Sequence, residues 1–204
     1  MITIVDYGVG NIRAFLNAYA RLTIPAETAT NAQALRGATK VILPGVGDFD
    51  EAMRRLDGSG MRDTLNELVL ERRVPVLGVC VGMQMLGRSS EEGVLPGLRW
   101  VAGDVRSFRS TSATEPLAVP HKGWNDVRPT PGNPLFNGLE ADARFYFLHS
   151  FYFQCDHGTD AAATTSYGAD FTSAVNSGNI FGVQFHPEKS HHWGTRLLQN
   201  FAAL

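Results

Sequence analysis

Cysteine is scarce in this chain: only Cys80 and Cys155 occur among its 204 residues. Two cysteines so far apart do not form the framework of several disulfides that holds small secreted proteins together. Charge of either sign is not in excess, because 18 lysines and arginines balance 20 aspartates and glutamates to a net charge of −2. We therefore expect neither the basic surface of a protein that binds nucleic acid nor that of a protein attracted to an acidic membrane.

Long apolar runs are also lacking. No stretch approaches the roughly 20 consecutive apolar residues that a membrane-spanning helix needs. The opening residues, MITIVDYGVGN, contain no basic segment and reach an aspartate at once, unlike a secretory signal peptide. We expect a cytoplasmic location, and a reactive thiol persists in that reducing setting.

The apolar residues that are present form a regular pattern in the first half of the chain. Strands are predicted at 2–5, 40–43 and 74–79, and helices at 10–22, from 48 onwards and at 59–73. Asn11 is a predicted N-cap, and Asp48 with Glu51 resembles a capping box. Strands that alternate with helices in this way indicate a parallel sheet covered by helices on both faces.

The second half of the chain favours short strands separated by proline and glycine. They are predicted at 144–150, 150–155, 170–175 and 180–185, and a final helix is predicted at 191–204. No linker-like composition separates the two halves. We therefore expect one α/β domain over residues 1–204, with a mixed sheet.

Cys80 lies in the stretch VPVLGVCVGMQML, where an apolar strand pattern changes into a helical one. Gly78 and Gly82 flank it as G-x-C-x-G, which matches the nucleophile elbow described for G-x-S-x-G with sulfur replacing oxygen. Glycine at both positions lets the backbone crowd at a sharp turn. The alternative is that Cys80 is a small buried hydrophobe, as we expect for Cys155 in FYFQC, and the stretch alone does not decide.

A thiolate nucleophile needs a base, and His186 is the best placed of the six histidines. It comes just after an apolar strand, and the carboxyl ends of strands form the active edge of open α/β sheets. Glu188, two residues further on, is suited to orient the imidazole. One alternative is an ordinary polar strand end. Another is a metal site of Cys80, His191 and His192, for which the sequence shows no metal-ligand spacing.

Acyl transfer also needs hydrogen-bond donors for an oxyanion. The backbone N–H of Val81 is one candidate, and the glycine-rich segment LPGVGDF around Val46 offers a second because it follows a parallel strand. A plain turn is the alternative for this segment. It is not a Walker-type phosphate loop, since no G-K-[ST] follows, and YGVGN near Tyr7 lacks the third glycine of a dinucleotide fingerprint.

Five segments now stand out in order along the chain: PGVGDF (44–49), GVCVGMQ (78–84), VPHKGWN (119–125), FLHSF (147–151) and GVQFHPEKS (182–190). Together they resemble the class I (triad) glutamine amidotransferases and, more closely, the family of glutaminase subunits of imidazole glycerol phosphate synthase. The likeness extends over nearly the whole chain, from IVDYGVGN to the last helix. It implies a three-layer α/β fold with a mixed, mostly parallel central sheet.

The resemblance also implies a role for each matched position. Cys80 would attack the carboxamide of glutamine, His186 would transfer protons, and Glu188 would orient the histidine. Substrate contacts would come from Gly45, Val46, Gly47 and Val81 around the oxyanion, from Gln84, and from the backbone at Ser150 and Phe151. With no cofactor and no metal, the ammonia would pass to a (β/α)8-barrel cyclase and form imidazole glycerol phosphate in histidine biosynthesis.

The resemblance places the interface with this cyclase at four residues: Asn11, Lys122, Trp124 and Lys189. Trp124 is expected in a loop as an interface anchor, and a buried core tryptophan is the alternative. Two positions depart from the family pattern, because Lys122 replaces a usually apolar residue and Phe151 replaces the usual tyrosine.

The departure from the family pattern at Lys122 leaves other functions open. A related branch of the family supplies ammonia to amidotransferases of surface-sugar synthesis, and this is the main alternative. A non-catalytic interaction subunit is a second alternative, against which the intact set of Cys80, His186 and Glu188 argues. A cysteine peptidase would share the nucleophile chemistry but would not explain the GWN motif.

Overall fold

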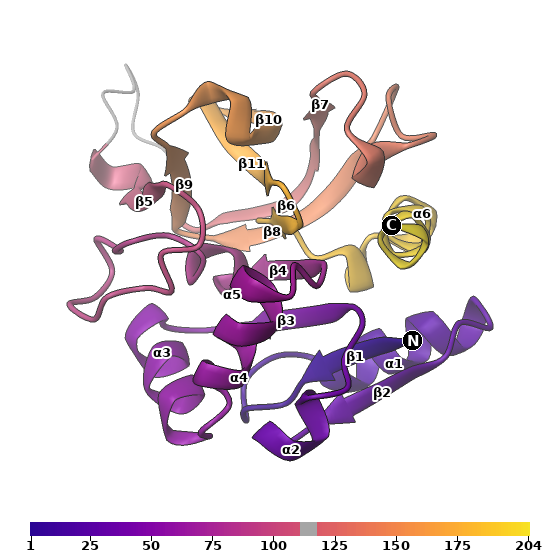
Figure 1. Ribbon diagram of the computed structural model, residues 1–204. Coiled ribbons are helices and arrows are strands. Elements are labelled where there is room, and N and C mark those ends of the chain that lie inside the picture. Colours follow the sequence, from indigo (N-terminus) through magenta and orange to yellow (C-terminus); the bar gives the residue numbers. More distant parts are fainter. Residues whose placement is uncertain (111–117) are drawn as a thin grey trace.

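The computed structural model of the chain describes residues 1–110 and 118–204 (Figure 1). Its helices are α1 (Ile12–Arg21), α2 (Ala32–Leu35), α3 (Phe49–Gly58), α4 (Arg62–Asn66), which continues as a π-helical turn (Glu67–Glu71), α5 (Val81–Gln84) and α6 (His191–Ala203). Its strands are β1 (Ile2–Val5), β2 (Ala26–Ala29), β3 (Val41–Gly45), β4 (Val76–Cys80), β5 (Gly103–Ser107), β6 (His121–Asp126), β7 (Arg128–Pro129), β8 (Arg144–His149), β9 (Phe151–Cys155), β10 (Ala161–Tyr167), β11 (Ala169–Ser177) and β12 (Ile180–Val183).

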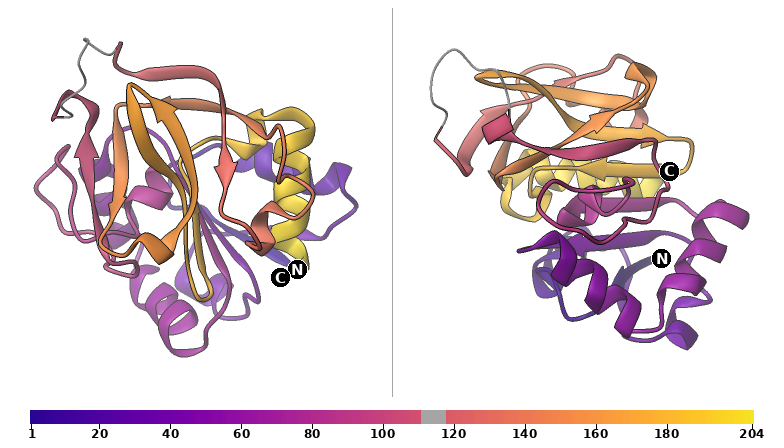
Figure 2. Two further views of the ribbon diagram at one scale, coloured as in Figure 1. Left: turned by 90° about the horizontal axis from the view of Figure 1, so that it is seen from above. Right: turned by 90° about the vertical axis from the view of Figure 1, so that its left-hand side faces the viewer.

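Ten of these strands form one mixed sheet, as predicted. The neighbours β2, β1, β3, β4 and β12 are all parallel to one another. The sheet then continues through antiparallel β11, β10 and β7, while β9 and β5 extend it from β11. Strands β6 and β8 form a separate antiparallel pair. Figures 1 and 2 show the antiparallel strands of the second half above the parallel strands of the first half.

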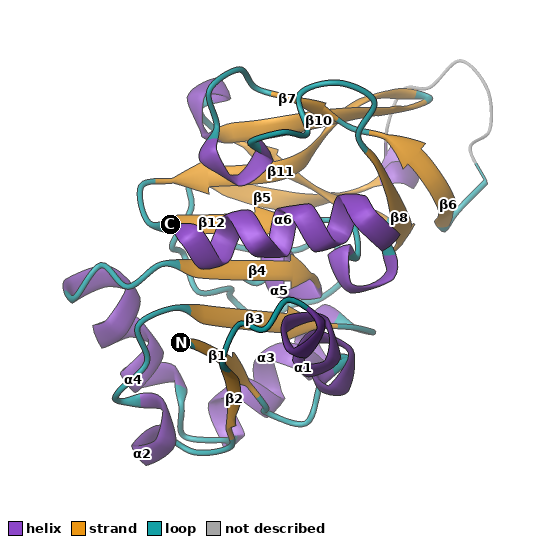
Figure 3. Ribbon diagram, turned by 90° about the vertical axis from the view of Figure 1, so that its right-hand side faces the viewer, coloured by secondary structure: helices purple, strands orange, loops and turns teal. Residues whose placement is uncertain are grey.

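Helices cover both faces of the parallel part of the sheet. In Figure 3, α1 and α6 lie in front of the strands, and α3 and α5 lie behind them. Every residue of β1, β3, β4 and β12 is buried, which is why these segments are apolar apart from Thr3 instead of alternating with polar residues. The three-layer α/β fold implied by the resemblance is therefore confirmed.

Some local predictions need correction. Asp48 caps α3 through the N–H of Glu51 at 2.9 Å, but Asn11 makes no side-chain cap for α1. The sequence does not predict strands β2, β5, β6, β7 and β10 or helix α2. Trp124 lies in strand β6 and not in a loop. Within the part of the chain that the structure describes, no helix has both the length and the apolar character needed to cross a membrane.

Candidate active site

The parallel pairing of β4 with β12 brings the two candidate catalytic segments together. Val79 lies opposite Val183 in this ladder, so both strands end at the same edge of the sheet. Cys80 is the last residue of β4, and His186 is the third residue after β12. Ligands of open α/β sheets bind at this carboxyl edge. Residues 106 positions apart in the sequence are thus adjacent because of strand order.

Cys80 occupies a strained turn between strand and helix. Its φ of 56° and ψ of −113° lie outside the regions that non-glycine residues usually adopt, and such a residue costs about 1–3 kcal/mol, which the surrounding packing must offset. Helix α5 begins at the next residue. A Cβ on Gly82 would lie only 2.0 Å from the carbonyl oxygen of Leu43, so only glycine permits this close approach. The geometry is that of a nucleophile elbow.

His186 and Glu188 form a buried pair beside the thiol. The Nδ1 atom of His186 lies 2.9 Å from Oε1 of Glu188, and the two side chains are 3% and 1% exposed. Burial lowers the pKa of His186, but the hydrogen bonds and charges of Cys80 and Glu188 outweigh it and raise this pKa to about 9. The protonated imidazole favoured by these contacts is the form that pairs with a thiolate nucleophile.

A cavity of about 400 Å³ opens at Cys80 and His186. Its wall includes most of the residues predicted to contact a substrate: Val46, Gly47, Val81, Gln84, Ser150 and Phe151. Gly45 instead ends strand β3, where it lies opposite Cys80 in the parallel ladder. Gly47 has a φ of +83°, a conformation that glycine adopts without strain. The loop after β3 and the loop after β8 thus meet across the thiol.

Four further residues line the cavity and were not predicted: Glu92, Pro120, Leu148 and His149. Glu92 is the chemically informative one, because it brings a partly buried carboxylate to the cavity. Burial raises its pKa, against the hydrogen bond from the N–H of Phe49, and the charges of Asp48 and Asp50 raise it further. The sequence around Glu92, SSEEGVLPG, reads as an ordinary polar loop, so only the fold reveals this position.

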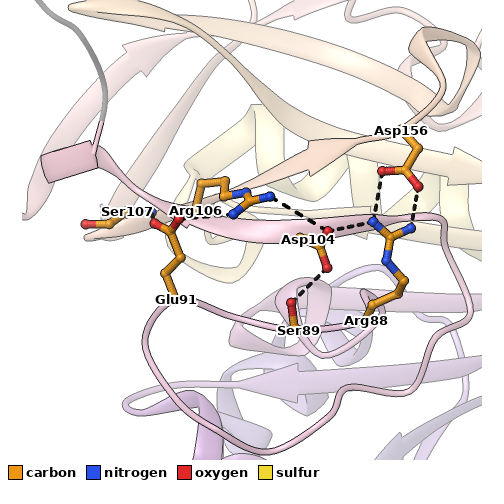
Figure 4. Close-up of polar contacts among 7 residues, drawn as sticks. All are labelled: Arg88, Ser89, Glu91, Asp104, Arg106, Ser107 and Asp156. Carbon is orange, nitrogen blue, oxygen red and sulfur yellow. Dashed lines mark hydrogen bonds and ion pairs between the residues drawn. The ribbon is translucent and has the colours of Figure 1, made fainter.

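The loop that carries Glu92 is held by charged contacts on its outer side (Figure 4). Arg88 pairs with Asp104 and Asp156, and Glu91 accepts hydrogen bonds from Arg106 and from the N–H of Ser107. These groups are partly exposed to solvent, so each pair contributes little to stability on its own. Because several such contacts occur at one place, together they still restrain the loop between α5 and β5.

Helix α3 holds the same loop from the other side. The carboxylate of Asp50 accepts hydrogen bonds from the N–H groups of Val94 and Leu95 at 3.0–3.1 Å. Glu92 in turn accepts the N–H of Phe49, the first residue of α3, at 3.0 Å. The position of Glu92 is therefore tied to the helix that directly follows the PGVG segment.

The four predicted interface residues are exposed: Asn11, Lys122, Trp124 and Lys189. Lys189 also lines the cavity. The ring of Trp124 is 38% exposed and stacks on His191 at a centroid distance of 5.3 Å. Val46 and Leu148, at the cavity, are 41% and 40% exposed. Large apolar side chains thus reach the surface around the cavity.

No metal centre is found among the described residues. Within 1–110 and 118–204, no group of three or more histidine, cysteine, aspartate and glutamate side chains is arranged to hold a metal ion. His191 stacks on Trp124, and His192 packs against Trp193 with ring centroids 4.0 Å apart. These two histidines therefore make aromatic contacts, not a ligand set with Cys80.

Comparison with known proteins identifies the family of this chain. The family model of the class I glutamine amidotransferases matches residues 3–203. An imidazole glycerol phosphate synthase subunit HisH from Bdellovibrio bacteriovorus is 59% identical over 204 residues, all of both chains, and one from Leptospira interrogans is 51% identical over the same span. A crystal structure of a glutamine amidotransferase superposes with a TM-score of 0.75 at 20% identity, covering 100% of this chain and 99% of that one. From its sequence and its fold alike, the chain belongs to the class I glutamine amidotransferase family.

Proposed function

We propose that this chain hydrolyses L-glutamine to glutamate and ammonia, and that it delivers the ammonia to a (β/α)8-barrel cyclase that makes imidazole glycerol phosphate in histidine biosynthesis. The observation that carries the first part is the strained Cys80 beside the buried His186–Glu188 pair in one cavity. The names of the full-length relatives support the second part.

The reaction follows from the order of these groups. The Cys80 thiolate attacks the carboxamide carbon of glutamine, and the resulting oxyanion takes hydrogen bonds from the N–H of Val81 and from the PGVG segment at Val46. His186 gives its proton to the leaving nitrogen, so ammonia departs and a thioester remains. His186 then takes a proton from water, whose oxygen attacks the thioester and releases glutamate with the thiolate restored. Glu188 keeps the imidazole oriented throughout.

The cavity also offers contacts for the amino-acid part of glutamine. Glu92 presents a carboxylate for the ammonium group, and Gln84 lies on the wall next to the thiol. Ser150 and Phe151 line the same cavity, and their backbone is proposed to bind the substrate carboxylate. A backbone contact at this position does not need the tyrosine hydroxyl that Phe151 lacks.

The Glu92→Gln variant tests the ammonium contact. The KM for glutamine should rise about 10- to 100-fold, because the glutamine side chain still accepts the Phe49 N–H but carries no charge for the ammonium. The kcat should change much less, since Glu92 is proposed to hold the ammonium group and not the reacting carboxamide. Steady-state kinetics of the active complex measure both, and Glu91→Gln, which alters the neighbouring carboxylate on the Arg106 side, is the matched control. Equal KM values for the two variants would remove Glu92 from the substrate site.

The isolated chain should be almost inactive, and a bound partner should activate it. The glycines of PGVG make reorientation of its peptides easy, so the second oxyanion donor need not point inwards at rest. One missing donor costs on the order of 10²–10³ in rate. Lys189 lines the cavity and Lys122 and Trp124 are exposed, so a partner bound at these three residues would come close to this segment.

Glutaminase rates measured for the chain alone, with the histidine-pathway cyclase, and with the cyclase plus its ligand test this proposal. We expect at least a hundredfold stimulation in the last case, with the Cys80→Ala complex as the background control. A high rate for the isolated chain would contradict the gating. Stimulation by an amidotransferase of surface-sugar synthesis, without stimulation by the cyclase, would replace the acceptor proposed here.

A further inference from the structure

Two buried histidines outside the catalytic pair form a continuous chain of hydrogen bonds to the cavity. Nδ1 of His121 lies 2.9 Å from Nε2 of His149, and Nδ1 of His149 lies 2.7 Å from the carbonyl oxygen of Phe151. At the other end, Nδ2 of Asn125 lies 3.2 Å from Nε2 of His121. The two imidazoles are 3% and 6% exposed. The reaction described above uses neither of them.

Which nitrogen donates in each of these hydrogen bonds follows from the last acceptor, the carbonyl oxygen of Phe151. A carbonyl oxygen only accepts, so Nδ1 of His149 must donate to Phe151, and in a neutral ring Nε2 then accepts. His121 must therefore donate from Nδ1, which leaves its Nε2 to accept from the amide of Asn125. Burial lowers the pKa of His121 to about 4. Burial, the dominant effect, and the charges of His121 and His186 lower the pKa of His149 to about 3, so both rings are neutral near pH 7.

The chain continues from the Phe151 carbonyl towards the thiol. Nε2 of Gln84 donates to the same carbonyl at 3.2 Å and to Oε1 of Gln184 at 3.0 Å. Nε2 of Gln184 lies 3.8 Å from Sγ of Cys80. The histidine chain and Gln84 thus supply two donors to one carbonyl, whose two lone pairs are then both used. Gln84 and His149 therefore share one acceptor.

Aromatic neighbours hold the His121 ring in place. It stacks between Tyr167 at a centroid distance of 4.1 Å and Phe147 at 4.7 Å, and the edge of Phe108 lies against it. A ring held on both faces keeps its two nitrogens towards the same partners.

Strand β6 connects this series of hydrogen bonds to the surface of the protein. Side chains alternate between the two faces of a strand, so His121 and Asn125 share one face while Lys122 and Trp124 lie on the other. The first face contains the start of the hydrogen-bond chain, and the second is exposed and belongs to the proposed partner interface. A shift of β6 on binding of the partner would move the donor to His149 directly.

We propose that His121 is a positioning residue for the glutamine site, which sets Gln84 and the Phe151 carbonyl through His149 and links them to the partner-facing strand β6. This inference rests on the proposed function, because it takes the Gln84 side of the cavity as the substrate site. His121 itself touches neither the substrate nor the reacting atoms.

Three variants of the full chain in its complex with the cyclase test the inference. His121→Phe removes the donor and keeps a flat ring, and it should raise the KM for glutamine about tenfold because Nε2 of His149 loses its partner. His121→Asn puts an amide Nδ2 close to the position of Nδ1, and it should restore the KM to within about threefold of the original value. Tyr167→Phe, which keeps the stacked ring and removes only a hydrogen bond to the Ala118 carbonyl, is the matched control and should leave the KM unchanged.

A second measurement does not depend on catalysis. Nitrogen-15 NMR of the histidine rings should show both His121 and His149 with the proton on Nδ1 and none on Nε2. Asn125→Asp places an acceptor opposite Nε2 of His121, so it should move the His121 proton to Nε2 and raise the KM as His121→Phe does. This variant keeps the imidazole in its site, so it also serves if His121→Phe does not fold.

The outcomes separate this inference from the proposed function. A proton on Nε2 of either ring in the unaltered protein would overturn the proposed direction of the hydrogen bonds, whatever the activity. An unchanged KM in His121→Phe and Asn125→Asp, in a complex that hydrolyses glutamine, would overturn the positioning role and leave the proposed function standing. Equal rises of KM in Tyr167→Phe and His121→Phe would also overturn it, since loss of packing alone would then account for the effect. Failure of the unaltered complex to hydrolyse glutamine would overturn both.

Discussion

The Cys80→Ala variant should lose glutamine hydrolysis by at least about 10⁴-fold while keeping its fold. The thiol is the only protein nucleophile of the proposed reaction, and the oxyanion donors alone supply a small residual rate. Alanine retains the Cβ that the unusual φ of 56° already accommodates, and the side chain is only 4% exposed, so removal of one sulfur atom leaves the turn in place. Glutaminase assays of the complex, with circular dichroism and thermal unfolding, measure both parts.

A glutamine-like electrophile gives an independent measurement of the same assignment. It should alkylate Cys80 and spare Cys155, because burial, against a hydrogen bond from Thr172, raises the pKa of the Cys155 thiol to about 11. Cys155→Ala is the matched control and should keep its activity and its labelling. Equal labelling of the two cysteines, or glutamine turnover that survives in Cys80→Ala, would refute the nucleophile assignment.

The second large effect concerns the histidine and its carboxylate partner. His186→Asn should lower kcat/KM by on the order of 10⁶, and Glu188→Gln by on the order of 10⁴, because the histidine transfers the protons and the carboxylate only orients it. Both variants are measured in the active complex, with the exposed His157→Asn as the control that should retain its activity. A larger loss in Glu188→Gln than in His186→Asn would reverse the two roles.

The pKa of His186 provides a check on the same pair. This pKa is raised to about 9, above the value of about 6.5 in an unfolded chain. A raised pKa in the folded state contributes stability that is fully present below pH 6.5 or so and is lost as the pH rises through about 9. In Glu188→Gln the pKa of His186 should fall, since one of the contacts that raise it is gone. Histidine NMR titration measures this shift, and an unchanged pKa would contradict the coupling.

Several features of the site could be predicted because their signals are local in the sequence. The apolar runs of β1, β3 and β4 indicate buried parallel strands, and G-x-C-x-G marks the turn at Cys80 without knowledge of its neighbours. His186 follows the last such run, and parallel strands end at one edge, so its proximity to Cys80 follows from strand order. Position after a strand favours it among the six histidines, and the resemblance to the family supplies the rest of the selection.

Other features of the sheet have weaker signals. Strands β6 and β10 contain small, polar and charged residues, and β2 exposes two of its four residues, so neither a continuous apolar run nor a strict alternation identifies them. Trp124 was therefore predicted in a loop, although pairing with β8 makes its segment a strand. Long-range backbone hydrogen bonds decide such elements, and they depend on the partner strand.

The composition and the order of apolar runs thus determined the α/β class and made Cys80, His186 and Glu188 candidates, and the resemblance of five segments to a known family selected them. The tertiary structure alone decided that Glu92 lines the cavity, because contacts from α3 and β5 hold its loop there. It alone decided that His121 and His149, 28 residues apart, share a hydrogen bond. The physical reason is that burial and hydrogen-bond partners depend on which surfaces pack together, and the pairing of distant segments is not a property of any short stretch of sequence.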